Sequence, residues 1–188
     1  MDFARFLFAL GIRHVGETTA QKIARHMRTW GEFTARVREA TALRPGPMFV
    51  RLQALDGLGD RTRESLLAAV AEGRLHVEAA DDADSAAVLA ASGVKDLKAP
   101  ARRALATSFP RWGDLKAALV AAAAERPGEA WTAFAALDGV GEVALNAVVA
   151  FFSEPHNSGV LENLLYMDGS NPEGVRVRDA AAPAASSR

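Results

Sequence analysis

Apolar residues recur at helical spacing along most of the chain. Between residues 18 and 27 the apolar positions are Ala20, Ile23, Ala24 and Met27. Steps of three or four residues place these side chains on one face of a helix. The same reasoning predicts further helices over residues 3–10, from residue 29 or 30 to 42, and over 49–55 and 62–71. Arg44-Pro45-Gly46-Pro47 predicts a loop.

The sequence repeats itself without a gap at an offset of 82 residues (112 − 30), as if duplicated in tandem. The matching segments are Trp30-Gly31-Glu32 with Trp112-Gly113-Asp114, Arg44-Pro45-Gly46 with Arg126-Pro127-Gly128, and Leu55-Asp56-Gly57-Leu58-Gly59 with Leu137-Asp138-Gly139-Val140-Gly141. We therefore expect one unit over residues 1–82 and a second over 83–167. Residues 168–188 show no periodic apolar pattern and predict a flexible tail or linker.

Composition supports an all-α fold. Apolar residues make up 49% of the 188 residues, alanine runs are frequent and aromatic residues are few. The chain has no cysteine, which excludes disulfides and thiolate metal sites. It has neither a signal-peptide pattern nor an apolar run of the roughly 20 residues that span a bilayer, so we expect a cytoplasmic protein.

The segment LDGVGEVALNAVV, residues 137–149, predicts a tight turn between two helices. Glycines suit the turn because it needs backbone angles that a side chain penalises, and because they let a ligand approach closely. The free backbone N–H groups at the start of the second helix form an anion site, which can hold a DNA phosphate without reading a base. Val140 is expected to point back and pin the two helices together.

Three further segments repeat this pattern. Residues 55–70 add Arg61 and Arg63 in the first turn of the second helix, residues 10–19 are a less regular version, and residues 93–100 carry Lys98 where the first unit has Gly16. We interpret that last hairpin as degenerate, with Lys95, Lys98, Arg102 and Arg103 retaining only charge-based contacts.

Charge is unevenly distributed although the net charge is only −1. Residues 1–28 carry five basic and two acidic residues, whereas residues 83–164 carry seven basic and nine acidic residues. If DNA is bound, the first helices should therefore dominate the electrostatic attraction. Trp30, Trp112 and Trp131 are expected to pack in cores, and no histidine pair has the i, i+4 spacing of a helical metal site.

The segments FARFLFALGIRHVGETTA (residues 3–20) and LDGVGEVALNAVVAFFSEPHNSGVLENLL (137–165) closely resemble the later helix-hairpin-helix region of bacterial NAD-dependent DNA ligases. The resemblance implies that hairpins hold the backbone of nicked double-stranded DNA, at residues 15–17 and 140–142. With the residues that flank the other turns, the predicted DNA-binding residues are Arg13, His14, Val15, Gly16, Glu17, Thr18, Lys22, Gly57, Gly59, Arg61, Arg63, Gly139, Val140, Gly141 and Glu142.

The chain also departs from that family. About residues 43–125 lie between the two resembling segments, the Lys-x-Asp-Gly adenylation motif and the four-cysteine zinc module are missing, and the tail ends where a BRCT-type domain is expected. The resemblance implies a ligase fragment or a free-standing derivative. It implies no cofactor in this chain, since NAD and a metal ion would belong to the absent catalytic domain; the remaining ligase domains are possible partners.

We therefore expect a non-catalytic module that binds duplex DNA independently of sequence, in replication and repair. A helical protein-protein interaction module with architectural hairpins is the alternative, favoured locally by the acidic second unit. A glycosylase or nuclease is disfavoured, because the sequence offers no convincing nucleophile, metal cluster or base-flipping pocket.

Overall fold

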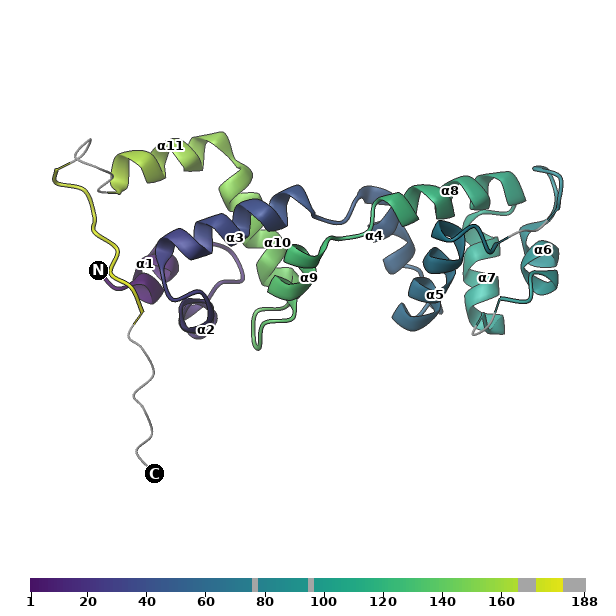
Figure 1. Cartoon of the computed structure of the whole chain (residues 1–188), viewed down its shortest axis with the longest axis horizontal. Coiled ribbons are helices and arrows are strands. Elements are labelled where there is room, and N and C mark those ends of the chain that lie inside the picture. The colour runs from purple at the N-terminus through teal and green to yellow at the C-terminus, as the bar shows by residue number, and fades with distance from the viewer. Residues whose placement is uncertain (76–77, 95–96, 166–171, 181–188) are drawn as a thin grey trace, which may run out of the picture. The chain divides into compact units, whose positions relative to one another are not determined.

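The fold is all-helical, as predicted. In a computed structural model that describes residues 1–75, 78–94, 97–165 and 172–180, eleven helices are found (Figure 1). Among those residues, β pairing is limited to three isolated bridges. The first five helices are α1 (Phe3–Ala9), α2 (Glu17–Met27), α3 (Trp30–Ala42), α4 (Pro47–Gln53) and α5 (Asp60–Ala71). The others are α6 (Ser85–Ala91), α7 (Ala99–Ser108), α8 (Trp112–Ala124), α9 (Glu129–Ala135), α10 (Gly141–Ser153) and α11 (Pro155–Leu164).

The helix positions recur with the offset seen in the sequence. Helices α1 to α4 begin at residues 3, 17, 30 and 47, and α6 to α9 begin at 85, 99, 112 and 129, a difference of 82 in each pair. Helices α5 and α10, which begin at residues 60 and 141, differ by 81. The predicted helices are therefore found with shifts of one or two residues at their ends. The fourth begins at Pro47 and not at Phe49, because proline is well tolerated in a first helical turn.

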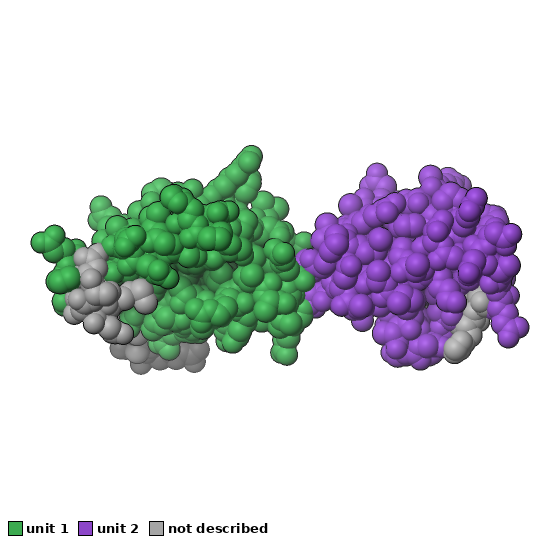
Figure 2. All heavy atoms as spheres, turned by 90° about the horizontal axis from the view of Figure 1, so that it is seen from above, with its two compact units in different colours: residues 1–44, 128–188 green, residues 45–127 purple. Residues whose placement is uncertain are grey.

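The compact units do not follow the predicted boundary between residues 82 and 83, which lies inside one of them. Unit 1 comprises residues 1–44 and 128–188, and unit 2 comprises residues 45–127 (Figure 2). In unit 1, α9 and α10 from the second repeat pack on α3 from the first; in unit 2, α4 and α5 pack on α8. The third helix of each repeat, α3 or α8, thus packs against the second hairpin of the other repeat. Both copies of that hairpin carry similar apolar faces, so the sequence pattern alone cannot show which copy packs where.

Each unit has its own core. In unit 1 it joins residues of α1 to α3, such as Phe3, Ile23 and Phe33, with residues of α9 and α10, such as Trp131 and Leu145. In unit 2 the core joins α4 and α5 with α6 to α8. Trp112 and Trp131 are nearly fully buried, and the partly buried Trp30 packs edge-on against Phe3 and Phe6. The prediction that the tryptophans are packing residues is confirmed.

The predicted flexible tail is wrong for residues 172–180, which dock on unit 1 alongside the N-terminus (Figure 1). The Arg178 N–H donates to the Met1 carbonyl at 2.8 Å, and the Phe3 N–H donates to the Arg178 carbonyl at 3.0 Å. Val175 and Val177 pack against the hydrophobic clusters of this unit. The alternation Val175-Arg176-Val177-Arg178 has the two-residue period of an extended segment, which a search for helical periodicity does not detect. The rest of the predicted tail, residues 168–171 and 181–188, lies outside the described residues.

Candidate nucleic-acid interface

Three hairpin turns share a first residue with positive φ and one backbone hydrogen bond, but they differ at the second glycine, where Gly141 has φ +69° and Gly16 and Gly59 have φ −79° and −65°. In the α9–α10 turn Gly139 has φ +71° and the Val140 N–H donates to the Leu137 carbonyl at 3.0 Å. The α4–α5 turn matches it, with φ +87° at Gly57 and a 3.1 Å bond from the Leu58 N–H to the Leu55 carbonyl. The apolar residue of each turn, Val140 or Leu58, is buried. The expectation that Val140 pins its two helices together agrees with this burial.

The α1–α2 turn has the same geometry with a histidine in place of the first glycine. His14 has φ +64°, in the left-handed region that favours glycine, and the next residue, Val15, is 4% exposed. The Val15 N–H donates to the Ile12 carbonyl at 3.0 Å, as in the other two turns. Histidine is among the residues enriched in this region outside glycine. His14-Val15-Gly16 therefore corresponds to Gly57-Leu58-Gly59 and Gly139-Val140-Gly141, in agreement with the prediction that residues 10–19 are a less regular version of the turn.

The helix that follows each of these turns starts without a side-chain cap. Gly16 and Gly59 are the N-caps of α2 and α5, with extended backbone, and Val140 is that of α10; none makes a side-chain capping bond. Asp2, Thr29 and Asp84 cap α1, α3 and α6 through their side-chain oxygens, whereas α4, α7, α8, α9 and α11 also start without such a cap. An uncapped helix start leaves first-turn N–H groups and the positive end of the helix dipole available to an anion.

The residues around these helix starts are mostly exposed. Among the predicted site residues, the exposed ones are Arg13, His14, Gly16, Glu17, Thr18, Gly57, Gly59, Arg61, Gly139, Gly141 and Glu142, whereas Val15 and Val140 are buried as turn anchors. Acidic residues occupy the first turn of each helix, namely Glu17, Asp60 and Glu142. This placement favours the helix dipole, as the sequence indicated.

The α6–α7 hairpin differs in its second helix. Leu97 is buried like the anchors of the other turns, but the N-cap of α7 is Lys98 and Pro100 stands in the first turn. Proline has no N–H, so this helix start lacks one of the donors that an anion could use. Arg102 is half-buried and Arg103 is exposed, whereas Lys95 lies outside the described residues.

Two hairpins from opposite ends of the chain meet in unit 1. The Lys22 Nζ of α2 donates to Asp138 Oδ2 of the α9–α10 turn at 2.8 Å, and a Cβ added at Gly139 would collide with the Lys22 side chain. This hydrogen bond and the positive charge of Lys22 lower the pKa of the exposed Asp138 carboxyl. Lys22, predicted as a direct DNA contact, is thus engaged in joining the two hairpins.

The described residues of unit 2 show no equivalent of this ion pair. The counterparts of Lys22 and Asp138 at the 82-residue offset are Ala104 and Asp56. A depression of about 460 Å³ lies beside the Gly57 turn, lined by Asp56, Ala104 and Arg103 among others. A Cβ added at Gly57 would come within 3.2 Å of the Pro100 carbonyl oxygen, so the turn still packs closely on α7.

The prediction that Arg63 supports phosphate binding is wrong for this conformation, because the residue is only 5% exposed. Its Nη1 donates to Asp60 Oδ1 at 2.8 Å, and its guanidinium lies 4.9 Å from the Phe49 ring centroid. Its Nε is buried without a hydrogen-bond partner. The counterpart of Arg63 in the second repeat is Leu145, a fully buried core residue. Helical register therefore places position 63 in the core of unit 2.

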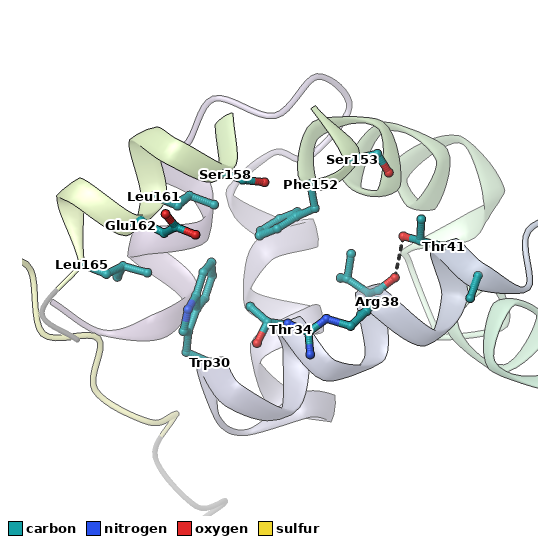
Figure 3. A pocket seen from close by; sticks show the side chains of 12 residues that line it. Trp30, Thr34, Arg38, Thr41, Phe152, Ser153, Ser158, Leu161, Glu162 and Leu165 are labelled. Atoms are coloured by element: carbon teal, nitrogen blue, oxygen red, sulfur yellow. Dashed lines mark hydrogen bonds between the residues drawn. The ribbon is translucent and has the colours of Figure 1, made fainter. Parts of the chain in front are cut away.

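Unit 1 also contains a pocket of about 570 Å³ between α3, the end of α10 and α11 (Figure 3). Trp30, Phe152 and Leu161 provide apolar walls, and Arg38 and Glu162 also line it.

No cluster of three or more side chains suited to a metal ion is found among the described residues. The helices of the described ranges include none long and apolar enough to cross a membrane.

Comparison with known proteins agrees with the hairpin geometry. Residues 5–39 match the family model for the helix-hairpin-helix motif, which covers most of α1, all of α2 and most of α3. A DNA ligase of Methylobacterium sp. (strain 4-46) is 37% identical over 181 residues, which cover 96% of this chain and 20% of that protein. A DNA ligase of Caulobacter sp. (strain K31) is 33% identical over 167 residues, covering 86% of this chain and 21% of that protein. No solved structure matches the chain significantly.

These alignments also bear on the residues between the two resembling segments. A match that covers 96% of the chain includes residues of both units, so unit 2 has a counterpart in the Methylobacterium protein. The chain spans about a fifth of the length of the relatives it matches. Over nearly its whole length, it is similar to a helix-hairpin-helix region of bacterial DNA ligases.

Proposed function

We propose that the chain binds the sugar-phosphate backbone of double-stranded, preferably nicked, DNA without reading its sequence, as part of a ligase. The observation that carries the proposal is the meeting in unit 1 of the α1–α2 and α9–α10 hairpins through Lys22 and Asp138, each with a buried turn residue and a following helix without a side-chain cap. Backbone N–H groups at the starts of α2 and α10 donate to phosphate oxygens, and Arg13 adds positive charge beside the first turn. Such contacts position a duplex and carry little sequence information.

No catalytic step is assigned to this chain. In a ligase, nucleotidyl transfer from NAD and any metal-assisted chemistry would belong to other regions of the protein. The contribution of this region is to hold the duplex. Alone it binds weakly, with a Kd on the order of 10⁻⁴ to 10⁻⁶ M at physiological salt, which is typical of non-specific backbone contacts.

Gly16→Asp tests the proposal at the first turn. A Cβ at Gly16 meets no atom within 4 Å, and the backbone there is extended, so aspartate fits without strain. Its carboxylate can cap α2 itself, which occupies the N–H donors and repels a phosphate. We expect roughly a tenfold or greater loss of affinity for nicked duplex in fluorescence anisotropy, because a hydrogen bond to a charged group contributes about 1.5–3 kcal/mol. Affinity of the wild type should fall steeply with salt.

Gly31→Asp is the matched control. It adds the same charge in unit 1 at the start of α3, which Thr29 already caps and which follows no hairpin turn. It should leave affinity within about twofold of the wild type, because exposed substitutions away from the contact change little. Equal losses in the two variants, both shown to be folded by circular dichroism, would refute binding at the turn.

A protein-binding module is the second candidate, favoured by the pocket of unit 1. Its apolar walls, with Trp30 and Phe152, suit an apolar side chain of a partner. Wild-type chain that fails to bind duplex even at low salt would favour this alternative. If Trp30→Ala leaves both the duplex affinity and its salt dependence unchanged, the pocket has no role in DNA binding.

A further inference from the structure

Residues 172–180, here called the strap, form backbone hydrogen bonds with two segments of unit 1: residues 1–3 and Arg28. Besides its bonds with Met1 and Phe3, the strap donates from the Ala180 N–H to the Arg28 carbonyl at 2.8 Å. Val175 and Val177 pack inward, whereas the side chains of Arg176 and Arg178 are exposed. The strap is thus a docked extended segment with one apolar and one basic face.

The strap contacts the open end of the α1–α2 hairpin, which lies opposite the turn that joins the two helices. Phe3 begins α1 and Arg28 is the C-cap of α2, whereas the turn with Val15 and Gly16 joins the opposite ends of the two helices. Arg28 has φ +60°, a conformation that non-glycine residues rarely adopt and that persists only where the surroundings hold it. The bond from Ala180 is one of the contacts that hold this carbonyl in place.

Unit 2 closes the equivalent hairpin without a strap. Residues 85 and 110 are the counterparts of 3 and 28 at the 82-residue offset, and there the Ser85 N–H donates directly to the Pro110 carbonyl at 3.0 Å. The Trp112 N–H likewise donates to the Ala83 carbonyl at 2.9 Å, and Asp84 and Arg111 form an antiparallel bridge. In unit 1 the strap stands between the two segments that pair with each other in unit 2.

We propose that the strap can dock and undock, and that the open end of the α1–α2 hairpin is held by the strap in one state and by direct pairing of residues 1–3 with 28–30 in the other. When the strap is docked, it bonds to the segment before α1 and to the carbonyl of Arg28. When it leaves, residues 1–3 pair directly with residues 28–30, as their counterparts do in unit 2, and α1 moves toward the start of α3. The docking does not depend on the proposed function, whereas its effect on duplex binding through the Val15-Gly16 turn rests on it.

The double variant V175D/V177D tests the docking, because it places carboxylates on the packed face of the strap. Amide hydrogen exchange, followed residue by residue by NMR in the whole chain, should show the Arg178 and Ala180 amides losing protection. The Trp30 amide, the counterpart of Trp112, should gain protection as the segments pair directly. Amides of unit 2 serve as the internal reference. Affinity for nicked duplex should fall at least threefold.

R178E is the matched control, since it changes the net charge by the same amount on the exposed face. It should keep the wild-type exchange pattern. The docking is overturned if Arg178 and Ala180 exchange equally fast in the wild type and V175D/V177D, and the direct pairing is overturned if Trp30 gains no protection. Unchanged affinity after release overturns the coupling to DNA. A wild-type chain that binds no duplex overturns the proposed function, while the exchange data still decide the docking.

Discussion

At the scale of single residues, Arg63 shows how position within a helix overrides residue type. Its sequence context, in the first turn after a glycine turn, suggested a cation that meets a phosphate. The helical register instead places it at the core position that Leu145 occupies in the second repeat. The guanidinium is accommodated by Asp60 and by the ring of Phe49, and its Nε lies 3.6 Å from Glu64 Oε1 without making a hydrogen bond.

Arg63→Leu should therefore leave unit 2 equally stable or make it more stable, by up to a few kcal/mol. Replacing a buried charged group by an apolar residue of fitting shape is often neutral or stabilising by about 1–4 kcal/mol. Asp60 is 85% exposed in its side chain, so it stays solvated after losing its partner. Urea unfolding monitored by circular dichroism gives the free energy of unfolding. A loss above about 2 kcal/mol would show that the ion pair and the ring contact outweigh the cost of burying the charge.

At the scale of elements, the hairpins are joined by a contact that their individual sequences do not encode. The ion pair between Lys22 and Asp138 connects α2 to the α9–α10 turn, although 116 residues separate the two side chains along the chain. The counterpart of Lys22 in unit 2 is Ala104, so Asp56 has no lysine at the equivalent place. The two units therefore provide a natural comparison for the effect of this ion pair.

Asp138→Asn should lower the stability of unit 1 near neutral pH and lose that effect in acid. The pKa of Asp138 is lowered in the folded protein, chiefly by the hydrogen bond from Lys22 and by its charge. A lowered folded-state pKa stabilises the fold above the unfolded-state value of about 3.9, and the contribution is lost as pH falls through the folded-state pKa. The difference in unfolding free energy between wild type and variant should shrink as the pH falls below about 5, and should continue to shrink until the lowered folded-state pKa has been passed.

Asp56→Asn provides the control for this pH series. Asp56 lies beside Ala104, so its substitution should give a difference in unfolding free energy that varies less with pH. Thermal unfolding across the same pH range, with separate probes for each unit, measures both variants. The same acid dependence in both would mean that the Lys22 contact is not its source.

At the scale of the whole molecule, the folding unit is not the repeating unit. Unit 2 is one continuous stretch, residues 45–127, inserted between the two segments that form unit 1. The Gly128 N–H donates to the Leu43 carbonyl at 2.8 Å, so the two ends of the gap in unit 1 lie next to each other. Joining residues 44 and 128 would thus need only a short linker.

We expect that residues 45–127 alone, and residues 1–44 linked to 128–188 by a few glycines, each fold on their own. Each retains a complete core, so each should unfold cooperatively on heating, as measured by circular dichroism or calorimetry. Residues 1–82 separate α1–α3 from α9 and α10, which complete their core, and should be less stable. Cooperative unfolding of residues 1–82 together with no folding of 45–127 would instead identify the sequence repeat as the folding unit.

The sequence by itself determined the local features of this protein. Helix positions followed from the spacing of apolar residues, the turns followed from glycine, and the buried Val140 followed from its place between two turn glycines. These features depend on interactions over a few residues. The sequence predicted a less regular turn over residues 10–19, whereas the positive φ of His14 in that turn became evident only from the structure.

Only the tertiary structure decided which hairpin packs against which helix. Two similar copies of each apolar face compete for the same partners, and local patterns do not distinguish them. The exchange of hairpins between α3 and α8, the burial of Arg63 and the docking of the strap all depend on contacts between distant residues. The unit that joins the α1–α2 hairpin to the α9–α10 turn is therefore a product of long-range packing.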